Sequence, residues 1–134
     1  MNFNEFLKKT EKAEIEPLYL FYGEEKLLLG DAVSRILDRT MVADSREFNY
    51  DVFDGEKTGI ADVVAIAQSY PFCSSWRVIL IRDINLIAAE GLELLIQYIK
   101  KPSPTTCLIL VAAKPDMRKK FFREVKDLLS PIQI

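Results

Sequence analysis

The sequence contains no histidine among its 134 residues. This absence excludes a histidine-based catalytic triad, a zinc site with histidine ligands and the usual general base near neutral pH. Any enzyme built on this chain would have to use carboxylates, lysines or a bound metal ion.

Long hydrophobic runs are also missing. No apolar segment approaches the roughly 20 residues needed to cross a bilayer, and Met1–Phe6 shows no signal-peptide hydrophobic region. The only cysteines are Cys73 and Cys107, and the net charge is −2. We therefore expect a cytoplasmic protein with a buried Cys107, no disulfide and no general affinity for nucleic acid.

What the sequence does contain is a regular alternation of strand and helix patterns. Four short apolar runs predict strands, over Leu18–Tyr22, Asn49–Phe53, Arg77–Ile81 and Cys107–Ala112. The last two are apolar almost throughout, which is typical of parallel strands covered on both faces. The segment that ends at Ile134 resembles the beginning of a fifth strand, so we expect the chain to be part of a longer protein.

Helical spacing of apolar residues fills the segments between the strands. It predicts helices over residues 25–39, 60–69, 90–100 and 116–129, with Asp116 as the N-cap of the last, and a short leading helix within residues 1–16. Strands that alternate with helices indicate one α/β domain with a mainly parallel sheet flanked by helices.

The segment LYLFYGEEKLLLGDAV, residues 18–33, is arranged like the strand, turn and helix that open a nucleotide-binding domain. A P-loop needs a second glycine, a lysine and a Ser/Thr hydroxyl at fixed distances from its first glycine. Counted from Gly23, those positions hold Leu28, Leu29 and Gly30. The two glutamates after Gly23 add negative charge where phosphates would lie.

The ends of the third and fourth predicted strands lack ATPase chemistry as well. An ATPase would end the third strand with an acidic pair that holds magnesium and activates water, but here only Asp83 is available, beside Arg82. Alanines 112 and 113 stand at the end of the fourth strand, where an ATPase often places a polar residue against the γ-phosphate. Together with the altered P-loop, these losses predict a nucleotide site that is inactive.

Two other function classes stay open at this point. One is a working AAA+ ATPase or nucleotide switch. The other is a phospho-acceptor receiver domain, in which Glu24 and Glu25 would be the acidic pair, Asp83 the acceptor and Lys114 the lysine before a proline.

Four segments then point to a family: PLYLFYGEEKLLL, FNYDVFDGE, YPFCSSWRVILIRD and LIQYIKKPSPTTCLILVAAKPDMRKKFFREVK. In order and spacing they resemble the N-terminal domain of the delta subunit of the bacterial DNA polymerase III clamp loader, from about Pro17 to about Lys126. The resemblance implies a P-loop NTPase-like, AAA+-like three-layer fold without ATPase activity, catalytic residues, cofactor or metal. It also implies that residues 1–134 are the first domain of a longer protein with a lid and a collar domain.

The resemblance implies partners too. Delta subunits bind the ring-shaped sliding clamp, the beta subunit, and help to open it during DNA replication. They contact the gamma or tau and delta prime subunits chiefly through domains absent here, and meet DNA only within the assembled complex.

The clamp contact in this family is made by apolar residues at a helix end before the third strand. Here the matching segment is Gln68, Ser69, Tyr70, Pro71 and Phe72, which is similar to a clamp-binding pentapeptide of glutamine, two variable residues, leucine and phenylalanine. Gln68 and Phe72 match, whereas Pro71 replaces the leucine. Because proline breaks a helix, Tyr70 and Phe72 are predicted to project from a turn, where aromatic clusters mark binding sites. The alternative is that Phe72 folds inward to cover the sheet edge.

Two charged segments of the sequence each allow two interpretations of their role. The basic residues of the last helix are either its solvated face or a contact to DNA phosphates; they are Lys114, Arg118, Lys119, Lys120, Arg123 and Lys126. The acidic residues Asp51, Asp54 and Glu56 suggest either a metal site or, with the Asp-Gly pair, a strand that enters a turn. We favour the turn.

Overall fold

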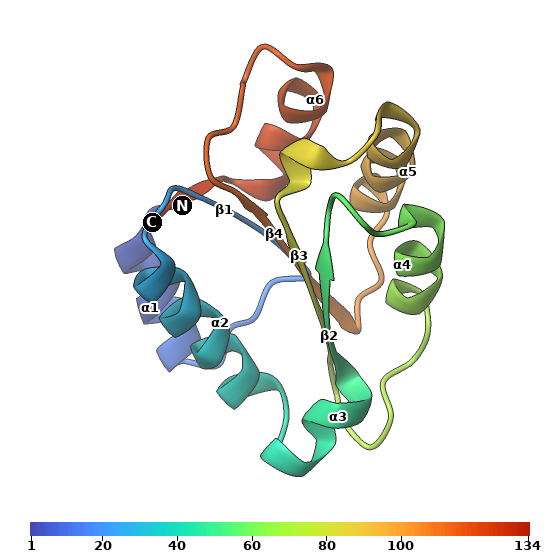
Figure 1. Ribbon diagram of the computed structural model, residues 1–134. Coiled ribbons are helices and arrows are strands. Elements are labelled where there is room, and N and C mark those ends of the chain that lie inside the picture. The colour runs from blue at the N-terminus through green and yellow to red at the C-terminus, as the bar shows by residue number, and fades with distance from the viewer.

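A computed structural model describes residues 1–134 and contains a five-stranded sheet in which every strand pair is parallel. The strand order is β2-β3-β4-β1-β5 (Figure 1). The strands are β1 (Leu18–Tyr22), β2 (Tyr50–Asp54), β3 (Arg77–Arg82), β4 (Thr106–Ala112) and β5 (Ile132–Gln133). The predicted fold class, a P-loop NTPase-like three-layer α/β fold with a mainly parallel sheet, is therefore confirmed.

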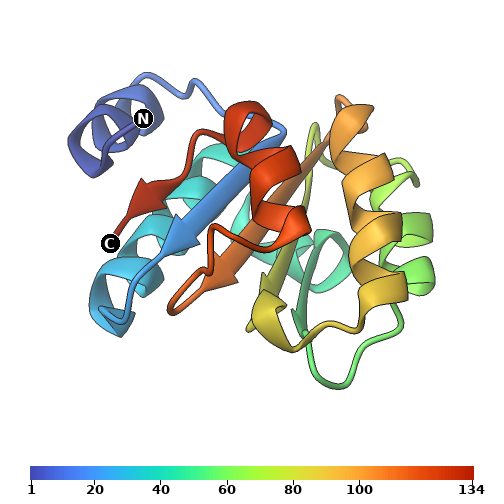
Figure 2. The same cartoon turned by 90° about the horizontal axis from the view of Figure 1, so that it is seen from above.

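Helices cover both faces of this sheet (Figure 2). One face carries α1 (Phe3–Glu11) and α2 (Lys26–Thr40), and the other carries α4 (Ile60–Ala67), α5 (Ala89–Lys100) and α6 (Lys120–Leu129). Three short elements complete the chain, namely the 3-10 turns η1 (Ala43–Ser45) and η2 (Ile84–Leu86) and the single-turn helix α3 (Arg46–Asn49). No helix has the length and apolar character needed to traverse a membrane.

The sheet separates two hydrophobic clusters. Successive strand side chains point to opposite faces, so Leu108 and Leu110 of β4 pack with α4, α5 and α6, while Cys107 and Ile109 pack with α1 and α2. All seven residues of β4 are buried, which explains why this strand is apolar almost throughout. Cys107 is buried and both cysteines are free, as predicted.

Most predicted boundaries agree with the structure to within one residue, and three differences deserve mention. Asn49 ends helix α3 instead of opening β2, and α4 ends at Ala67 instead of residue 69. Asp116 is not the N-cap of the last helix, because its carboxylate accepts hydrogen bonds from the backbone and guanidinium of Arg118. Lys119 is the N-cap residue, and α6 begins four residues later than Asp116.

Candidate functional site

The turn after β1 does not form a phosphate cradle. The Gly23 N–H, which would begin the cradle, donates to the carbonyl of Ala112 at 3.1 Å and so extends the sheet. Gly23 has φ +133°, and a Cβ there would lie 2.5 Å from the carbonyl oxygen of Ile134. This glycine is therefore required by the close approach of the β5 segment, a role that needs no ligand.

An open cleft of about 920 Å³ runs from this turn along the α2 face to α3. Its charged lining consists of Glu24, Glu25, Asp54, Asp83, Lys26, Arg46 and Arg82. Leu29 and Gly30, which stand at the lysine and hydroxyl positions of a P-loop, also line it. The cleft has the place of a nucleotide site in this fold but not the side chains that hold phosphate and magnesium.

The strand order argues against a receiver domain. Receiver-like folds have the order 2-1-3-4-5, in which the first and third strands are neighbours. Here β4 lies between β1 and β3. Lys114 does approach Glu24, with 3.6 Å between Nζ and Oε1, but both side chains are largely exposed.

The other end of the sheet carries the turn before β3, which holds the candidate docking residues. Helix α4 ends at Ala67, whose carbonyl would normally accept a hydrogen bond from the N–H of residue 71. Because Pro71 has no N–H, that carbonyl accepts instead from the hydroxyl of the buried Thr106, at 2.6 Å. The residue before a proline also avoids helical angles, so the helix cannot continue through Tyr70, and Gln68 is its C-cap residue.

The side chains of this turn are on the surface. Tyr70 is 85% exposed and Phe72 is 59% exposed, as predicted, while Pro71 is half-buried. Gln68 and Ser69 are exposed as well. The alternative in which Phe72 folds inward to cover the sheet edge is therefore wrong.

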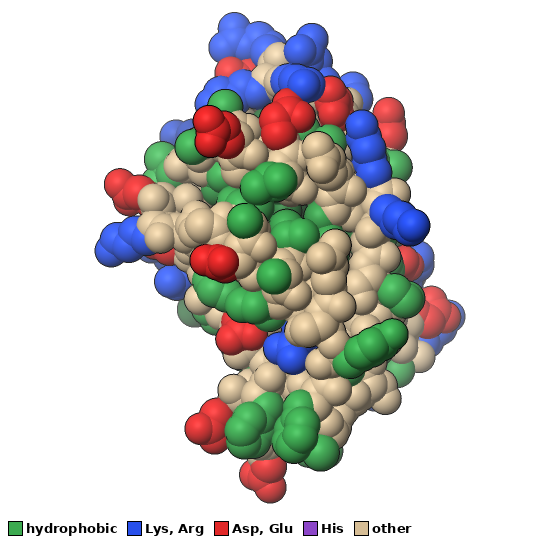
Figure 3. Space-filling view, turned by 90° about the vertical axis from the view of Figure 1, so that its right-hand side faces the viewer, with side chains coloured by type: hydrophobic (Ala, Val, Ile, Leu, Met, Phe, Trp, Pro, Cys, Tyr) green, Lys and Arg blue, Asp and Glu red, His purple; other side chains and the backbone are tan.

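Phe48 of α3 is a third exposed ring, beside this turn, and no local pattern in the sequence indicates it. Its centroid lies 5.4 Å from that of Phe72, with an edge-on orientation, and Phe48 is 55% exposed. Figure 3 shows hydrophobic side chains gathered at the lower end of the molecule, where α3 lies in Figure 1. We refer to Phe48, Tyr70 and Phe72 as the aromatic patch.

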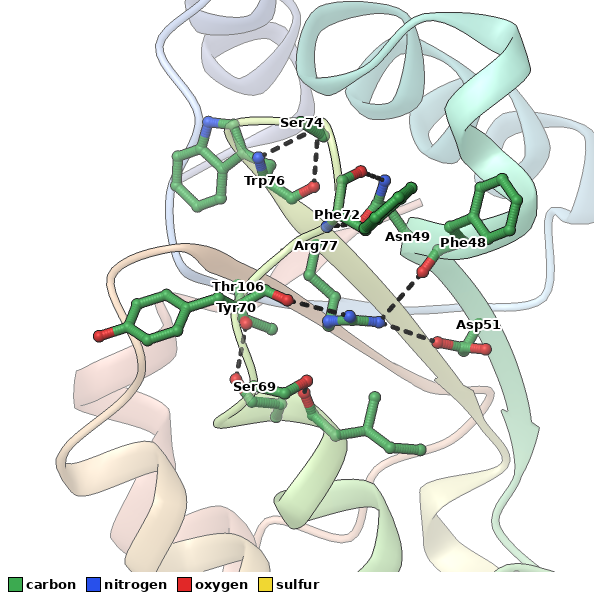
Figure 4. A network of polar contacts seen from close by, with 12 residues as sticks. Phe48, Asn49, Asp51, Ser69, Tyr70, Phe72, Ser74, Trp76, Arg77 and Thr106 are labelled. Carbon is green, nitrogen blue, oxygen red and sulfur yellow. Dashed lines mark hydrogen bonds and ion pairs between the residues drawn. The ribbon is translucent and has the colours of Figure 1, made fainter.

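A network of polar contacts underlies the aromatic patch (Figure 4). The side-chain amide of Asn49 bonds both backbone groups of Phe72, and the Arg77 guanidinium donates to the carbonyls of Tyr70 and Phe48. Ser74 donates to the carbonyls of Thr40 and Trp76. The turn is thus tied to α3, to the end of α2 and to β3.

The basic residues near α6 lie at the opposite end of the molecule, at the top of Figure 3. The shortest of their ion pairs joins Lys120 Nζ to Glu93 Oε1 at 2.6 Å, and the hydrogen bond that Lys120 donates to this carboxylate raises the pKa of Lys120. Arg118 pairs with Asp116, and its hydrogen bonds lower the pKa of that carboxyl. Lys119, Arg123 and Lys126 make no ion pair.

The acidic segment is a strand that enters a turn, as we favoured: Asp51 and Asp54 lie in β2, and Glu56 lies in the turn that follows. Asp54 Oδ1 accepts from the backbone of Glu56 at 3.3 Å, while Asp51 pairs with Arg77 at 3.6 Å. No group of three or more acidic or cysteine side chains is arranged to hold a metal ion.

Comparisons with known proteins agree on one family. The family model for the DNA polymerase III delta subunit matches residues 19–132. The DNA polymerase III subunit delta of Bacillus subtilis is 31% identical over 129 residues, which cover 89% of this chain and 37% of that protein. The chain thus spans little more than a third of the length of this relative.

Solved structures extend the likeness to the fold. The Bacillus subtilis DNA clamp loader delta protein matches with a TM-score of 0.89 and 28% identity, covering 98% of this chain and 42% of that one. A DNA polymerase III gamma subunit-related protein of Thermotoga maritima has a TM-score of 0.66 at 10% identity, covering 96% and 45%. The RuvB protein of the same organism has a TM-score of 0.60 at 17% identity, covering 96% and 41%. These last two share the fold alone.

Proposed function

The chain belongs to the DNA polymerase III delta subunit family, and we propose that it is the AAA+-like N-terminal domain of such a subunit, with the aromatic patch as its clamp-binding surface. In this role it binds the sliding clamp through Gln68–Phe72 and helps to open the ring during replication in the cytoplasm. The whole subunit, of which this domain is a part, contacts the gamma or tau and delta prime subunits chiefly through domains outside residues 1–134.

The observation that carries this proposal is the exposure of three aromatic rings, two on a turn fixed by polar contacts and one on the adjoining helix α3. Aromatic side chains are common anchors in protein interfaces, and they contribute most where they enter a pocket on the partner. Figure 4 shows the Tyr70 and Phe48 rings pointing in opposite directions, with Phe72 close to Phe48. The patch therefore offers two separate apolar contacts, the Phe48–Phe72 pair and Tyr70, and Pro71 lies between them in the chain.

The proposed role includes no ATP hydrolysis by this domain. The Gly23 N–H already donates a hydrogen bond to the carbonyl of Ala112. Leu29 and Gly30 supply neither the amine that ATP requires nor the hydroxyl that magnesium requires. A nucleotide switch is the second candidate, but only the position of the cleft favours it. DNA contact through Lys119, Arg123 and Lys126 is proposed only for the assembled complex.

A clamp-retention assay tests the proposal. The wild-type chain is immobilised and exposed to the purified sliding clamp of the same organism, beside a variant that combines Tyr70→Ala with Phe72→Ala. Leu128→Ala is the matched control, because Leu128 is an apolar residue, 51% exposed, on the distant helix α6. We expect the wild type and the control to retain the clamp and the double variant to lose it. Equal retention by all three, or none by the wild type, would contradict the proposal.

A further inference from the structure

Asn49 is a fully buried polar residue, and two of the three hydrogen bonds of its side chain join it to Phe72 in the docking turn, residues 68–72. Its Oδ1 accepts from the N–H of Phe72 at 2.6 Å, and its Nδ2 donates to the carbonyl of Phe72 at 2.5 Å. The second amide hydrogen reaches the carbonyl of Ser45 at 3.1 Å, within the same helical turn. A buried amide must find partners inside the protein, and here most of those partners belong to a residue 23 positions away.

Both backbone groups of Phe72 are therefore fixed from outside the turn. A residue held at its N–H and its carbonyl has little freedom to rotate, so the direction in which its side chain leaves the surface is set by Asn49. Tyr70, two residues before Phe72, is held as well, since Arg77 donates to the carbonyl of Tyr70 at 3.2 Å and to that of Phe48 at 3.3 Å. The Arg77 side chain is only 12% exposed and pairs with Asp51.

We propose that Asn49 is a positioning residue, which holds Phe72 in its binding geometry before the partner arrives. This inference rests on the proposed clamp-binding function and adds its mechanism of preorganisation. A loop that must become ordered on binding loses affinity in doing so, whereas a turn already fixed by buried hydrogen bonds does not. Asn49 contributes no exposed surface of its own, so its effect on affinity has to act through Phe72.

Asn49→Ala is the first test of this role. It removes the hydrogen bonds to Phe72, and we expect clamp affinity, corrected for the folded fraction, to fall about tenfold. Ser45→Ala is the matched control, because it deletes a buried hydroxyl of the same segment that bonds only the carbonyl of Val42. The control should bind like the wild type. Equal affinities for wild type and Asn49→Ala, or an equal loss in the control, would overturn the inference.

A double-mutant cycle shows whether Asn49 acts through Phe72. If it does, Asn49→Ala should have little further effect on clamp affinity in a chain that already carries Phe72→Ala, because the two effects are coupled. Additive effects would show that Asn49 acts elsewhere and would overturn the positioning role. Tyr70 remains in both variants, which keeps residual binding measurable.

Asn49→Asp adds a pH profile that a merely structural role would not produce. A protonated aspartic acid can accept from the N–H of Phe72 and donate to its carbonyl, as the amide does, whereas the ionised carboxylate cannot donate. Burial raises the pKa of such a carboxyl, so the favourable form exists below that pKa and is lost as the pH rises through it. The clamp affinity of Asn49→Asp, divided by that of the wild type at the same pH, should therefore rise as the pH is lowered from about 8 to about 5.5. A flat ratio would overturn the inference.

The two proposals fail in different ways. No clamp binding by the wild-type chain would overturn the proposed function, and the positioning role with it. Binding by the wild type that is indifferent to Asn49 would overturn the positioning role alone. Amide exchange of the Phe72 N–H gives a readout without the clamp, since it should be slow in wild type and in Ser45→Ala but fast in Asn49→Ala.

Discussion

Truncation of Phe72 distinguishes a docking side chain from a core side chain, because the two predict opposite results. A fully buried phenylalanine loses about 3–5 kcal/mol of folding stability on mutation to alanine, whereas a surface substitution usually stays within about 0.5 kcal/mol. Phe72 is 59% exposed, and its main ring contact is the edge-on pair with Phe48. Such a pair adds about 0.5–1.5 kcal/mol. We therefore expect Phe72→Ala to lower the free energy of unfolding by about 1 kcal/mol.

The effect on clamp binding should be larger. Aromatic anchors at the centre of an interface commonly contribute about 2 kcal/mol or more, so Phe72→Ala should weaken binding about thirtyfold, at tenfold per 1.4 kcal/mol. Titration calorimetry with the sliding clamp gives the affinity, and urea unfolding of the same sample gives the stability. The loss of stability should lower the melting temperature by only about 3–5 °C.

Phe6→Ala is the core control for this experiment. Phe6 is fully buried between α1 and the sheet, where its ring packs edge-on against Tyr19 and Phe21. This variant should lose about 3–5 kcal/mol of stability, while its folded fraction keeps its affinity for the clamp. If Phe72→Ala behaved like Phe6→Ala, with a large loss of stability and unchanged affinity, the docking role of Phe72 would be refuted.

Other measurements test the remaining conclusions. Magnesium-ATP should leave the melting temperature unchanged, although a ligand at 100 times its dissociation constant would stabilise the fold by about 2.7 kcal/mol; a clear rise would support the nucleotide switch. Thr106→Val should cost about 1–3 kcal/mol in urea unfolding because it leaves the carbonyl of Ala67 buried without a donor, and Thr106→Ser should cost less; equal losses would contradict the hydrogen bond. Burial raises the pKa of the Cys107 thiol, so iodoacetamide should label the exposed Cys73 in the folded chain and Cys107 only after denaturation. Early labelling of Cys107 would contradict its burial.

Much of the fold could be predicted because it depends on short-range patterns. The apolar runs of β1, β3 and β4 and the helical spacing of α2 and α5 are visible in single segments of the sequence, and the structure places them within one or two residues. Asp116 shows the limit of this reasoning. It has the side chain of a good N-cap, but Arg118 lies two residues away and competes successfully for its carboxylate.

The candidate docking site could be predicted only in part, for a related reason. Pro71 and its aromatic neighbours mark an exposed turn by local chemistry alone. Phe48 and Asn49 belong to the candidate site through contacts with Phe72 that span 24 and 23 residues of sequence and exist only after β2 and β3 have paired. In the sequence, Asn49 resembles the first residue of a strand, because nothing local shows which backbone groups its amide will bond.

Parallel strands explain how this fold can lack a phosphate cradle and still support the proposed docking turn. The turn after β1 lies at the carboxyl edge of the sheet, whereas the turn before β3 lies at the amino edge, so the two are separated by the length of a strand. Five residues at about 3.3 Å each make that separation about 17 Å. Sites more than about 7–10 Å apart that share no partners usually contribute independently to stability and binding. Leucine at position 29 and glycine at position 30 can thus replace the P-loop side chains at one edge without disturbing the contacts of Asn49, Arg77 and Thr106 at the other.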